Sequence, residues 1–234
     1  MFIKSERYYD AIYAWKDYKA EAARLIEIIA AGKTSSGNAL LDVACGTGGH
    51  IPYLRQSFMI EGLDLDPEML RIARAQHPDV PFHAGDMADF ELGRQLDVVV
   101  SLFSSVAYMR TPDRLAKAVG AMTRHVRPGG VLIVEPFFSP QTWKERTGAP
   151  GAMVVEKPDL SIVRMTDWVR EGNLVTMTFH YLVGTADGVE HFTEEHELGL
   201  FSDEEHRAAF AAAGMTVAYD EKGLMGRGLY IGTW

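Results

Sequence analysis

One segment, residues 40–50 with the sequence LLDVACGTGGH, constrains the fold more than any other part of the chain. Its first half is apolar and predicts a strand that is buried on both faces of a parallel sheet. The glycine-rich half predicts a turn in which the missing side chains let a ligand approach the backbone closely. Because a helix is expected to begin after the turn, the segment is typical of a nucleotide-binding entry, although a GxG pattern alone is a weak signal.

Two features sharpen this interpretation. Asp42 lies inside the predicted strand, and the third glycine of the dinucleotide fingerprint is absent, since His50 and Ile51 follow the turn. A second apolar run, residues 59–63, ends at Asp64, which lies 22 residues after Asp42. The fingerprint places a ribose-binding carboxylate at about this distance, so we expect Asp64 to bind a ribose.

Residues 42–48 resemble the first motif of class I S-adenosylmethionine (SAM) methyltransferases. After a third strand-like run, residues 80–84, the triplet Gly85-Asp86-Met87 resembles the adenine-binding corner of that family. The resemblance implies that the Asp86 carboxylate accepts from the adenine amino group and that a backbone N–H donates to the ring. It implies SAM as the cofactor.

Strand-like and helix-like segments alternate throughout residues 39–135, which predicts an α/β fold with a mostly parallel, Rossmann-like sheet and helices on both faces. A helix is expected over residues 18–31, with Gly32 at its C′ position. Asp66 and Pro67 are expected to begin another helix as N-cap and first residue. Residues 127–130, Arg-Pro-Gly-Gly, predict a turn into the fifth strand.

The pattern changes after Pro136. Residues 152–200 show strand-like runs joined by hairpin turns, which predicts an antiparallel β platform inserted into the α/β sheet. Within residues 175–183 the odd positions are apolar and the even ones mostly polar, so one face is expected to be buried. We therefore divide the chain into a SAM-binding core with an N-terminal helical lid, residues 1–136 and 201–234, and a substrate-binding platform, residues 137–200, in a single compact unit.

After the platform the α/β pattern resumes. Residues 202–205 read as a capping box that opens a helix ended by Gly214. The last two strands, near residues 215–219 and 228–232, form an antiparallel end of the sheet in the methyltransferase family.

Composition limits the function classes. The net charge of −9 argues against a nucleic-acid substrate, and no apolar run approaches the ~20 residues of a membrane span. The N-terminus lacks the apolar core of a signal peptide. A single cysteine, Cys45, suits a reducing cytoplasm and is expected to be a packing residue. We expect a cytoplasmic enzyme with a small-molecule substrate, no nucleic-acid or membrane partner, and a homodimer left open.

The N-terminal residues are rich in tyrosine, with Tyr8, Tyr9, Tyr13 and Tyr18 close together. Two interpretations are open from the residues alone. The rings either pad the core as part of an amphipathic helix, or form a lid whose phenol groups reach the polar end of the cofactor.

The fourth strand separates kinds of methyltransferase. It is followed by Ser104-Ser105 instead of the Asn/Asp-Pro-Pro-aromatic signature of adenine N-methyltransferases. No cluster of acids suggests a catechol-type metal site, so no metal is expected. His191 and His196 are five residues apart and point to opposite faces of a regular strand, which makes them surface or platform histidines rather than a joint metal site.

A narrower resemblance covers nearly the whole chain. LFSSVAY at 102–108, VEPFF at 134–138, REGN at 170–173 and GRGLYIG at 226–232 resemble the bacterial nucleotide-sugar N,N-dimethyltransferases that complete desosamine- and mycaminose-type sugars. By this resemblance, Ser105 and Tyr108 face the reacting amine, and Arg164 and Arg227 face the substrate. To these we add His180 on the polar face of the platform. The expected cofactor site comprises Tyr9, Tyr18, Asp42, Gly46, Thr47, Gly48, Asp64, Leu65, Met69, Asp86, Met87 and Leu102.

The expected reaction is N,N-dimethylation of a nucleotide-linked deoxyaminosugar. Methyl transfer from a sulfonium needs alignment more than a strong base, and positioning can supply roughly 7–11 kcal/mol. Ser105 and Tyr108 are then hydrogen-bond acceptors that orient the amine. Two alternatives stay open: a methyltransferase of another small-molecule amine, and a non-catalytic SAM-binding protein.

Overall fold

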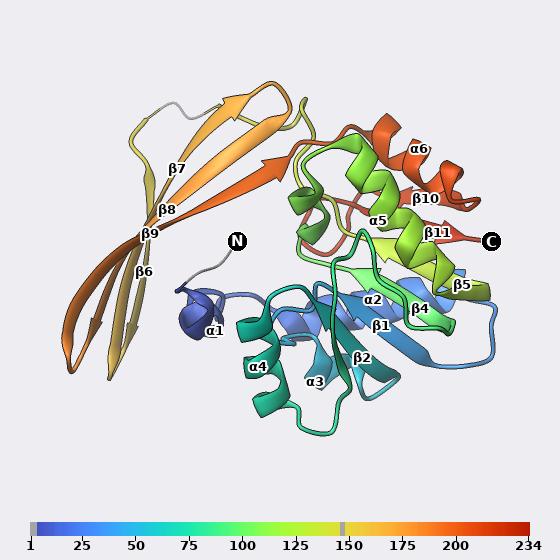
Figure 1. Ribbon diagram of the computed structural model, residues 1–234, viewed down its shortest axis with the longest axis horizontal. Helices are drawn as coiled ribbons and strands as arrows, with labels where there is room; N and C mark the ends of the chain where they lie inside the picture. Colours follow the sequence, from blue (N-terminus) through green and yellow to red (C-terminus); the bar gives the residue numbers. More distant parts are fainter. Residues whose placement is uncertain (1–3, 146–147) are drawn as a thin grey trace.

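The computed structural model describes residues 4–145 and 148–234, which form two β-sheets with helices packed around the larger one (Figure 1). The larger sheet has seven strands in the order β10-β11-β5-β4-β1-β2-β3. Strands β1 to β5 are mutually parallel, whereas β11 runs antiparallel to both β5 and β10. The strand bounds are β1 Ala39–Val43, β2 Met59–Asp64, β3 Phe82–Ala84, β4 Leu96–Ser101, β5 Val126–Val134, β10 Thr216–Asp220 and β11 Leu229–Thr233.

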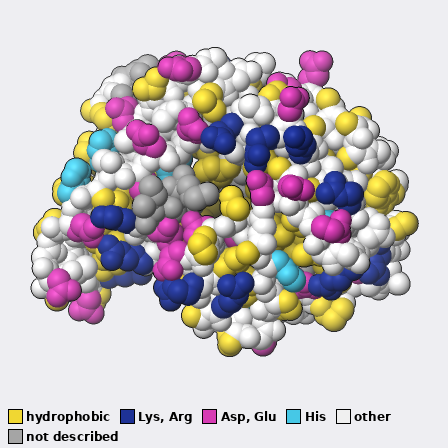
Figure 2. Space-filling model, in the orientation of Figure 1, with side chains coloured by type: hydrophobic (Ala, Val, Ile, Leu, Met, Phe, Trp, Pro, Cys, Tyr) yellow, Lys and Arg dark blue, Asp and Glu magenta, His cyan; other side chains and the backbone are white. Residues whose placement is uncertain are grey.

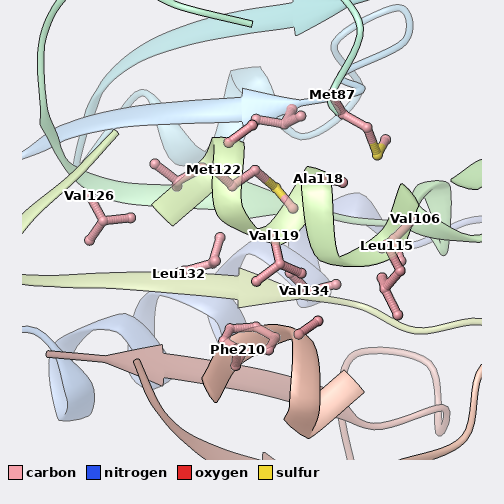
Figure 3. Close-up of a cluster of buried hydrophobic side chains, with 14 of the residues drawn as sticks. Met87, Val106, Leu115, Ala118, Val119, Met122, Val126, Leu132, Val134 and Phe210 are labelled. Carbon is pink, nitrogen blue, oxygen red and sulfur yellow. The ribbon is translucent and has the colours of Figure 1, made fainter. Parts of the chain in front are cut away.

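Helices cover both faces of this sheet, which confirms the predicted fold class. Strand β5 shows how, since Leu132 and Val134 point into one cluster and Val131 and Ile133 into the other. Helices α5 and α6 supply the first cluster, in which Phe210 packs close to β5 (Figure 3). Helices α2 and α3 supply the second. The helix bounds are η1 Glu6–Tyr8, α1 Tyr9–Ile12, α2 Tyr18–Gly32, α3 Ile51–Leu54, α4 Pro67–Gln76, η2 Ser105–Met109, α5 Pro112–Arg124 and α6 Asp203–Ala212.

The second sheet is antiparallel and has four strands in the order β6-β7-β8-β9. Its inner face packs Phe179, Tyr181 and Phe192 against Ala11 and Ile12 of α1. Helix α1 therefore lies between this sheet and the larger one (Figure 1). The bounds are β6 Gly151–Lys157, β7 Leu160–Glu171, β8 Leu174–Thr185 and β9 Gly188–Gly199. We call this sheet the platform.

The predicted caps are present where side chains define them. The Asp66 carboxylate accepts from the backbone N–H groups of Glu68 and Met69, and Ser202 and Glu205 form the capping box of α6.

Two local predictions were wrong. Gly32 is the last residue of α2 and not a C′ residue, because the chain leaves the helix through extended Lys33. Residues 127–130 lie within β5, which starts at Val126 and shifts its register against β4 between Leu96 and Val98. Gly129 has φ +76°, and a Cβ there would meet Thr34 Oγ1 at 2.7 Å, so the close approach of the preceding loop requires glycine.

No helix in the described part of the chain is long and apolar enough to cross a membrane.

Candidate active site

A cavity of about 520 Å³ opens at the carboxyl ends of the parallel strands and extends to the inner face of the platform. Its volume lies in the range of pockets that hold drug-sized ligands. Figure 2 shows the hollow with hydrophobic side chains inside it and Lys and Arg side chains gathered on one side. The location agrees with the rule that ligands of doubly wound sheets bind outside the carboxyl ends of the strands.

The glycine turn after β1 forms one wall of the cavity. Gly46 has φ +55° and nothing within 4 Å of the position of a Cβ, so its backbone faces open space. Its N–H donates to Asp64 Oδ2 at 2.7 Å, and the N–H of Asp66 donates to Asp64 Oδ1 at 2.9 Å. Burial raises the pKa of Asp64, although these backbone donors oppose the shift. Because a carboxylate has about four lone-pair sites, Asp64 keeps capacity for ligand hydroxyls.

Asp86 forms the wall at the far end of the same edge. Its Oδ1 accepts from Ala88 N–H at 2.9 Å, and its Oδ2 accepts from the Arg114 guanidinium at 2.8 Å. Burial would raise the pKa of Asp86, but these two donors outweigh it and hold the pKa below its usual value. The carboxylate is therefore charged at neutral pH and faces the cavity as an acceptor.

A second, smaller cavity of about 40 Å³ lies beside the glycine turn and shares Tyr9, Gly46 and Ser105 with the larger one. Asp42 lines it from inside β1. Burial, followed by the charge of Asp64, raises the pKa of Asp42 to about 7.

The N-terminal segment closes over this region. Thr47 Oγ1 donates to Asp10 Oδ1 at 2.6 Å, and Gln76 Nε2 donates to Asp10 Oδ2 at 2.6 Å. Asp10 therefore joins α1 to the glycine turn and to α4, and the neighbouring Tyr9 lines both cavities.

Backbone strain concentrates at the cavity. In the described residues, the non-glycine positions with positive φ are Ala44, Phe103, Ser104 and Arg110, and all four line the larger cavity. Such conformations persist only where surrounding contacts fix them. Here Phe103 N–H donates to Glu135 Oε2 at 2.6 Å and Ser104 Oγ donates to the Pro136 carbonyl at 2.7 Å. The strained turn after β4 thereby aims η2 at the cavity.

Two hydroxyl groups on η2 reach the cavity, and each has a hydrogen-bond partner within the protein. Ser105 Oγ donates to the Leu102 carbonyl at 2.9 Å, and the Tyr108 hydroxyl lies 2.7 Å from Nδ1 of His196 on β9. Burial raises the pKa of Tyr108 well above its usual value and lowers the pKa of His196. At neutral pH the phenol is therefore protonated and the imidazole is neutral.

The platform contributes a cation to the opposite wall. Arg164 donates from Nη1 to the Tyr13 hydroxyl at 3.3 Å, and its guanidinium lies 4.7 Å from the ring centroid of Phe179. These contacts are with a hydroxyl and an aromatic face rather than with a carboxylate. Arg164 Nε is buried and has no hydrogen-bond partner among the described residues.

Arg227 reaches the cavity from the loop before β11. Its Nη2 lies 3.3 Å from Oε1 of fully buried Glu135, and its guanidinium lies 5.7 Å from the Phe103 ring centroid. In contrast to Arg164, its charge is partly compensated within the protein.

The structure brings most of the predicted site residues together. The two cavities are lined by Tyr9, Tyr18, Asp42, Gly46, Thr47, Asp64, Leu65, Met69, Asp86, Met87, Leu102, Ser105, Tyr108, Arg164 and Arg227.

Two predicted residues are not among them. Gly48 lines neither cavity, and a Cβ there would meet Ile51 Cδ1 at 2.8 Å, so its role is close packing at the start of α3. His180 was placed wrongly, because the odd face of β8, with Met177 and Phe179, lines the cavity, and His180 is exposed on the other face.

The sequence reasoning missed several residues of the site. His196 is buried and lines the cavity, and the available signal in the sequence was the apolar pair Phe192 and Leu198 at even positions of β9. Arg114 and Asp10 carried no such signal, since they reach the site only through tertiary contacts with Asp86 and Thr47.

No group of three or more His, Cys, Asp or Glu residues that could hold a metal ion occurs within residues 4–145 and 148–234.

Comparison with known proteins agrees with this geometry. Residues 40–130 match the model of the methyltransferase domain family. The chain is 42% identical over 228 residues to the dTDP-3-amino-3,4,6-trideoxy-alpha-D-glucopyranose N,N-dimethyltransferase of Streptomyces venezuelae, covering 96% of this chain and 95% of that protein. The chain belongs to the family of these N,N-dimethyltransferases.

Solved structures agree with the assignment. The crystal structure of DesVI from Streptomyces venezuelae superposes with a TM-score of 0.91 at 40% identity, covering 100% of this chain and 99% of that one. CalS10 from Micromonospora echinaspora, an amino pentose methyltransferase solved with SAM bound, gives 0.85 at 38% identity and covers 100% and 97%. The chain is a SAM-dependent methyltransferase.

Proposed function

We propose that this enzyme methylates the amino group of a nucleotide-linked deoxyaminosugar twice, to the N,N-dimethyl product. The observation that carries the proposal is the larger cavity, which joins the glycine turn and Asp64 to a platform wall bearing Arg164. One end of the cavity has the groups that a SAM nucleoside requires. The other end has a cation that a diphosphate requires.

The residues present fit SAM. Asp64 would accept from the ribose hydroxyls and Asp86 from the adenine amino group, with Leu65, Met69 and Met87 as apolar walls. The smaller cavity, with Asp42, Thr47, Tyr18 and Leu102, would hold the methionine end, and Tyr9 would cover both parts. When bound there, SAM supplies a methyl group that the sulfonium charge activates for in-line displacement.

The protein's own contribution to the reaction is orientation. Ser105 and Tyr108 would accept N–H hydrogen bonds from the neutral amine and so direct its lone pair. Neither group is suited to act as a base, because burial raises the pKa of Tyr108 and a serine hydroxyl is a weaker acid still. The proton released from the methylated amine goes to water.

Arg164 is the group that best supports a diphosphate substrate. A guanidinium binds phosphate oxygens through a planar fork of donors, and the Arg164 charge is not paired with a carboxylate among the described residues. Arg227 would assist from the opposite side, with part of its charge already used by Glu135.

The test compares Arg164→Ala and Arg164→Lys with wild type in a mass-spectrometric assay of dTDP-linked amino sugars, scored at one and two added methyl groups. Arg164→Ala is expected to raise KM for the nucleotide sugar tenfold or more, about 1.4 kcal/mol, and to leave the Kd for SAM unchanged. Arg164→Lys should recover only part of the loss, because it keeps the charge and loses the fork. Arg170→Ala, on the same strand but outside the cavity lining, is the control.

The competing substrate class is a free small-molecule amine. If wild type methylates a free amine as efficiently as any nucleotide sugar and Arg164→Ala has no effect, that class replaces the nucleotide sugar. Because the family consists of enzymes, a non-catalytic SAM-binding role is not proposed.

Further predictions about partners and organisation belong to this proposal. We propose a homodimer, supported by apolar side chains on the outer face of the platform, and a cytoplasmic location, as the single Cys45 suggested. The net charge of −9 supports a small-molecule substrate over nucleic acid. The division into a core of residues 1–136 and 201–234 and a platform of residues 137–200 also stays a proposal.

A further inference from the structure

We propose that His196 and Glu194 are positioning residues that fix the direction of the Tyr108 hydrogen bond, so that the Tyr108 oxygen meets the substrate only as an acceptor. This inference rests on the proposed role of Tyr108 beside the reacting amine. It assigns a function to two platform residues.

The three side chains form a chain that leads from the cavity into the platform. The Tyr108 hydroxyl lies 2.7 Å from His196 Nδ1, and His196 Nε2 lies 3.7 Å from Glu194 Oε2. The side chains of His196 and Glu194 are 1% and 0% exposed, so water does not compete with these contacts.

Glu194 is itself held in place. Its Oε1 accepts from the backbone N–H groups of Lys4 and Ser5 at 2.7 and 2.9 Å, and its Oε2 accepts from Ser5 Oγ at 2.6 Å. The N-terminal segment thereby fixes the carboxylate beside the imidazole.

The neighbouring carboxylate of Glu194 sets the tautomer of His196. A neutral imidazole has one protonated nitrogen and one acceptor nitrogen. The Glu194 carboxylate favours the proton on Nε2, which leaves Nδ1 as the acceptor. Tyr108 must then donate its hydrogen to Nδ1, and its lone pairs are left for the cavity.

This direction matters for an amine substrate. A phenol that is free to rotate can donate its hydrogen to the amine lone pair, which is the electron pair that forms the new C–N bond. A phenol whose hydrogen is engaged can only accept, and it then directs the lone pair away from itself. Ser105 is set the same way by the Leu102 carbonyl, so both hydroxyls on η2 present acceptors.

A purely structural role for His196 is the alternative, since its ring also packs against Phe179 with centroids 5.0 Å apart. The first experiment addresses the tautomer directly in the protein without substrate. In ¹⁵N-histidine-labelled protein, with the His196 signals assigned by their loss in His196→Asn, Nε2 is expected to carry the proton and Nδ1 to show the shift of an unprotonated acceptor. A proton on Nδ1 would overturn the proposal.

The second experiment is a double-mutant cycle with Tyr108→Phe. His196→Leu is expected to lower kcat about tenfold, with KM and the Kd for SAM within about twofold of wild type. In the Tyr108→Phe background the same substitution should change kcat less than about twofold, because the hydroxyl that it acts through is gone. His196→Asn places an amide oxygen near the Nδ1 position and should recover most of the loss.

The controls separate the positioning role of His196 from a purely structural role and from failure of the nucleotide-sugar substrate. His191→Leu, on the same strand but on the exposed face, should leave kcat unchanged. If His196→Leu does not fold, His196→Phe, which fills the place of the ring and has no hydrogen-bond acceptor, completes the cycle. An equal loss in both backgrounds overturns the positioning role. The cycle is run with whichever amine the wild type methylates, so failure of the nucleotide-sugar substrate and failure of the positioning role give different results.

Discussion

Asp42 and Asp64 lie on neighbouring strands of the parallel sheet, and the charge of Asp64 adds to the cost of ionising Asp42. Asp42 is 2% exposed, and its pKa rises from 3.8 to about 7 through burial and then through the charge of Asp64. The folded protein therefore binds the Asp42 proton more tightly than the unfolded chain does. The free energy of unfolding is expected to fall as the pH rises from about 4 to about 7, by up to about 4 kcal/mol.

Asp42→Asn tests this sign. At pH 8 the free energy of unfolding, measured with urea, should be about 2–4 kcal/mol higher for the variant than for wild type. At pH 3, where Asp42 is largely protonated in both the folded and the unfolded state, the two proteins should differ little. Asp159→Asn on the exposed turn between β6 and β7 is the surface control. An increase in the free energy of unfolding that is equal at the two pH values contradicts the prediction.

For individual residues, positions at strand ends were predictable from the sequence, and the partners of their side chains were not. Asp64 and Asp86 follow apolar runs, so their place at the carboxyl edge of a parallel sheet could be read from local pattern. Arg114 could not be linked to Asp86, because a helix and a loop that are 28 residues apart in the chain meet only in the folded protein. The spacing of His196 from His191 excludes a joint metal site, but it carries no information on the burial of His196.

Among the elements, the N-terminal segment is short yet has three attachments. Ser5 binds Glu194 on the platform, Asp10 binds Thr47 at the glycine turn, and Ala11 and Ile12 pack on the inner platform face. The tyrosine-rich segment packs on a core, as the first interpretation predicts. Tyr9 and Tyr13 also line the cavity, as the lid interpretation predicts.

Asp10→Asn is expected to weaken SAM binding about three- to tenfold, because one of its two hydrogen bonds, to Thr47 or Gln76, is lost and Tyr9 is held less firmly. Titration calorimetry gives the Kd, and thermal unfolding without SAM should shift little because Asp10 is exposed. Lys19→Ala, on the exposed side of α2, is the matched control. Unchanged SAM affinity in Asp10→Asn would exclude the segment as a lid.

Elements whose ends depend on local contacts were predicted correctly, and those shaped by distant contacts were not. Caps at Asp66 and Ser202 were correct because they depend on side chains two or three residues away. The start of β5 was wrong because Gly129 is shaped by contact with Thr34, which lies far away in the sequence. The alternation in β8 gave the two faces correctly, but it could not tell which face meets the cavity, and His180 was assigned to the wrong one.

In the whole molecule, the platform uses both of its faces. The inner face closes the cavity, as Arg164, Phe179 and His196 show. The outer face carries side chains that a monomer would leave in water. Exposed apolar residues on this face are Val154, Met165, Val169, Leu182 and Val189.

The proposed homodimer uses this outer face, so that two platforms cover one another and the cavities stay open. Sedimentation equilibrium is expected to give twice the chain mass of 26.0 kDa for wild type. The double variant Val169→Lys/Leu182→Lys should sediment as a monomer, because like charges would face each other across the twofold axis, and it should keep kcat since neither residue lines the cavity. Met59→Lys places the same charge on an exposed apolar residue of the larger sheet and should leave the dimer intact. A wild-type monomer, or a dimer that survives both lysines, would assign the outer face to another role.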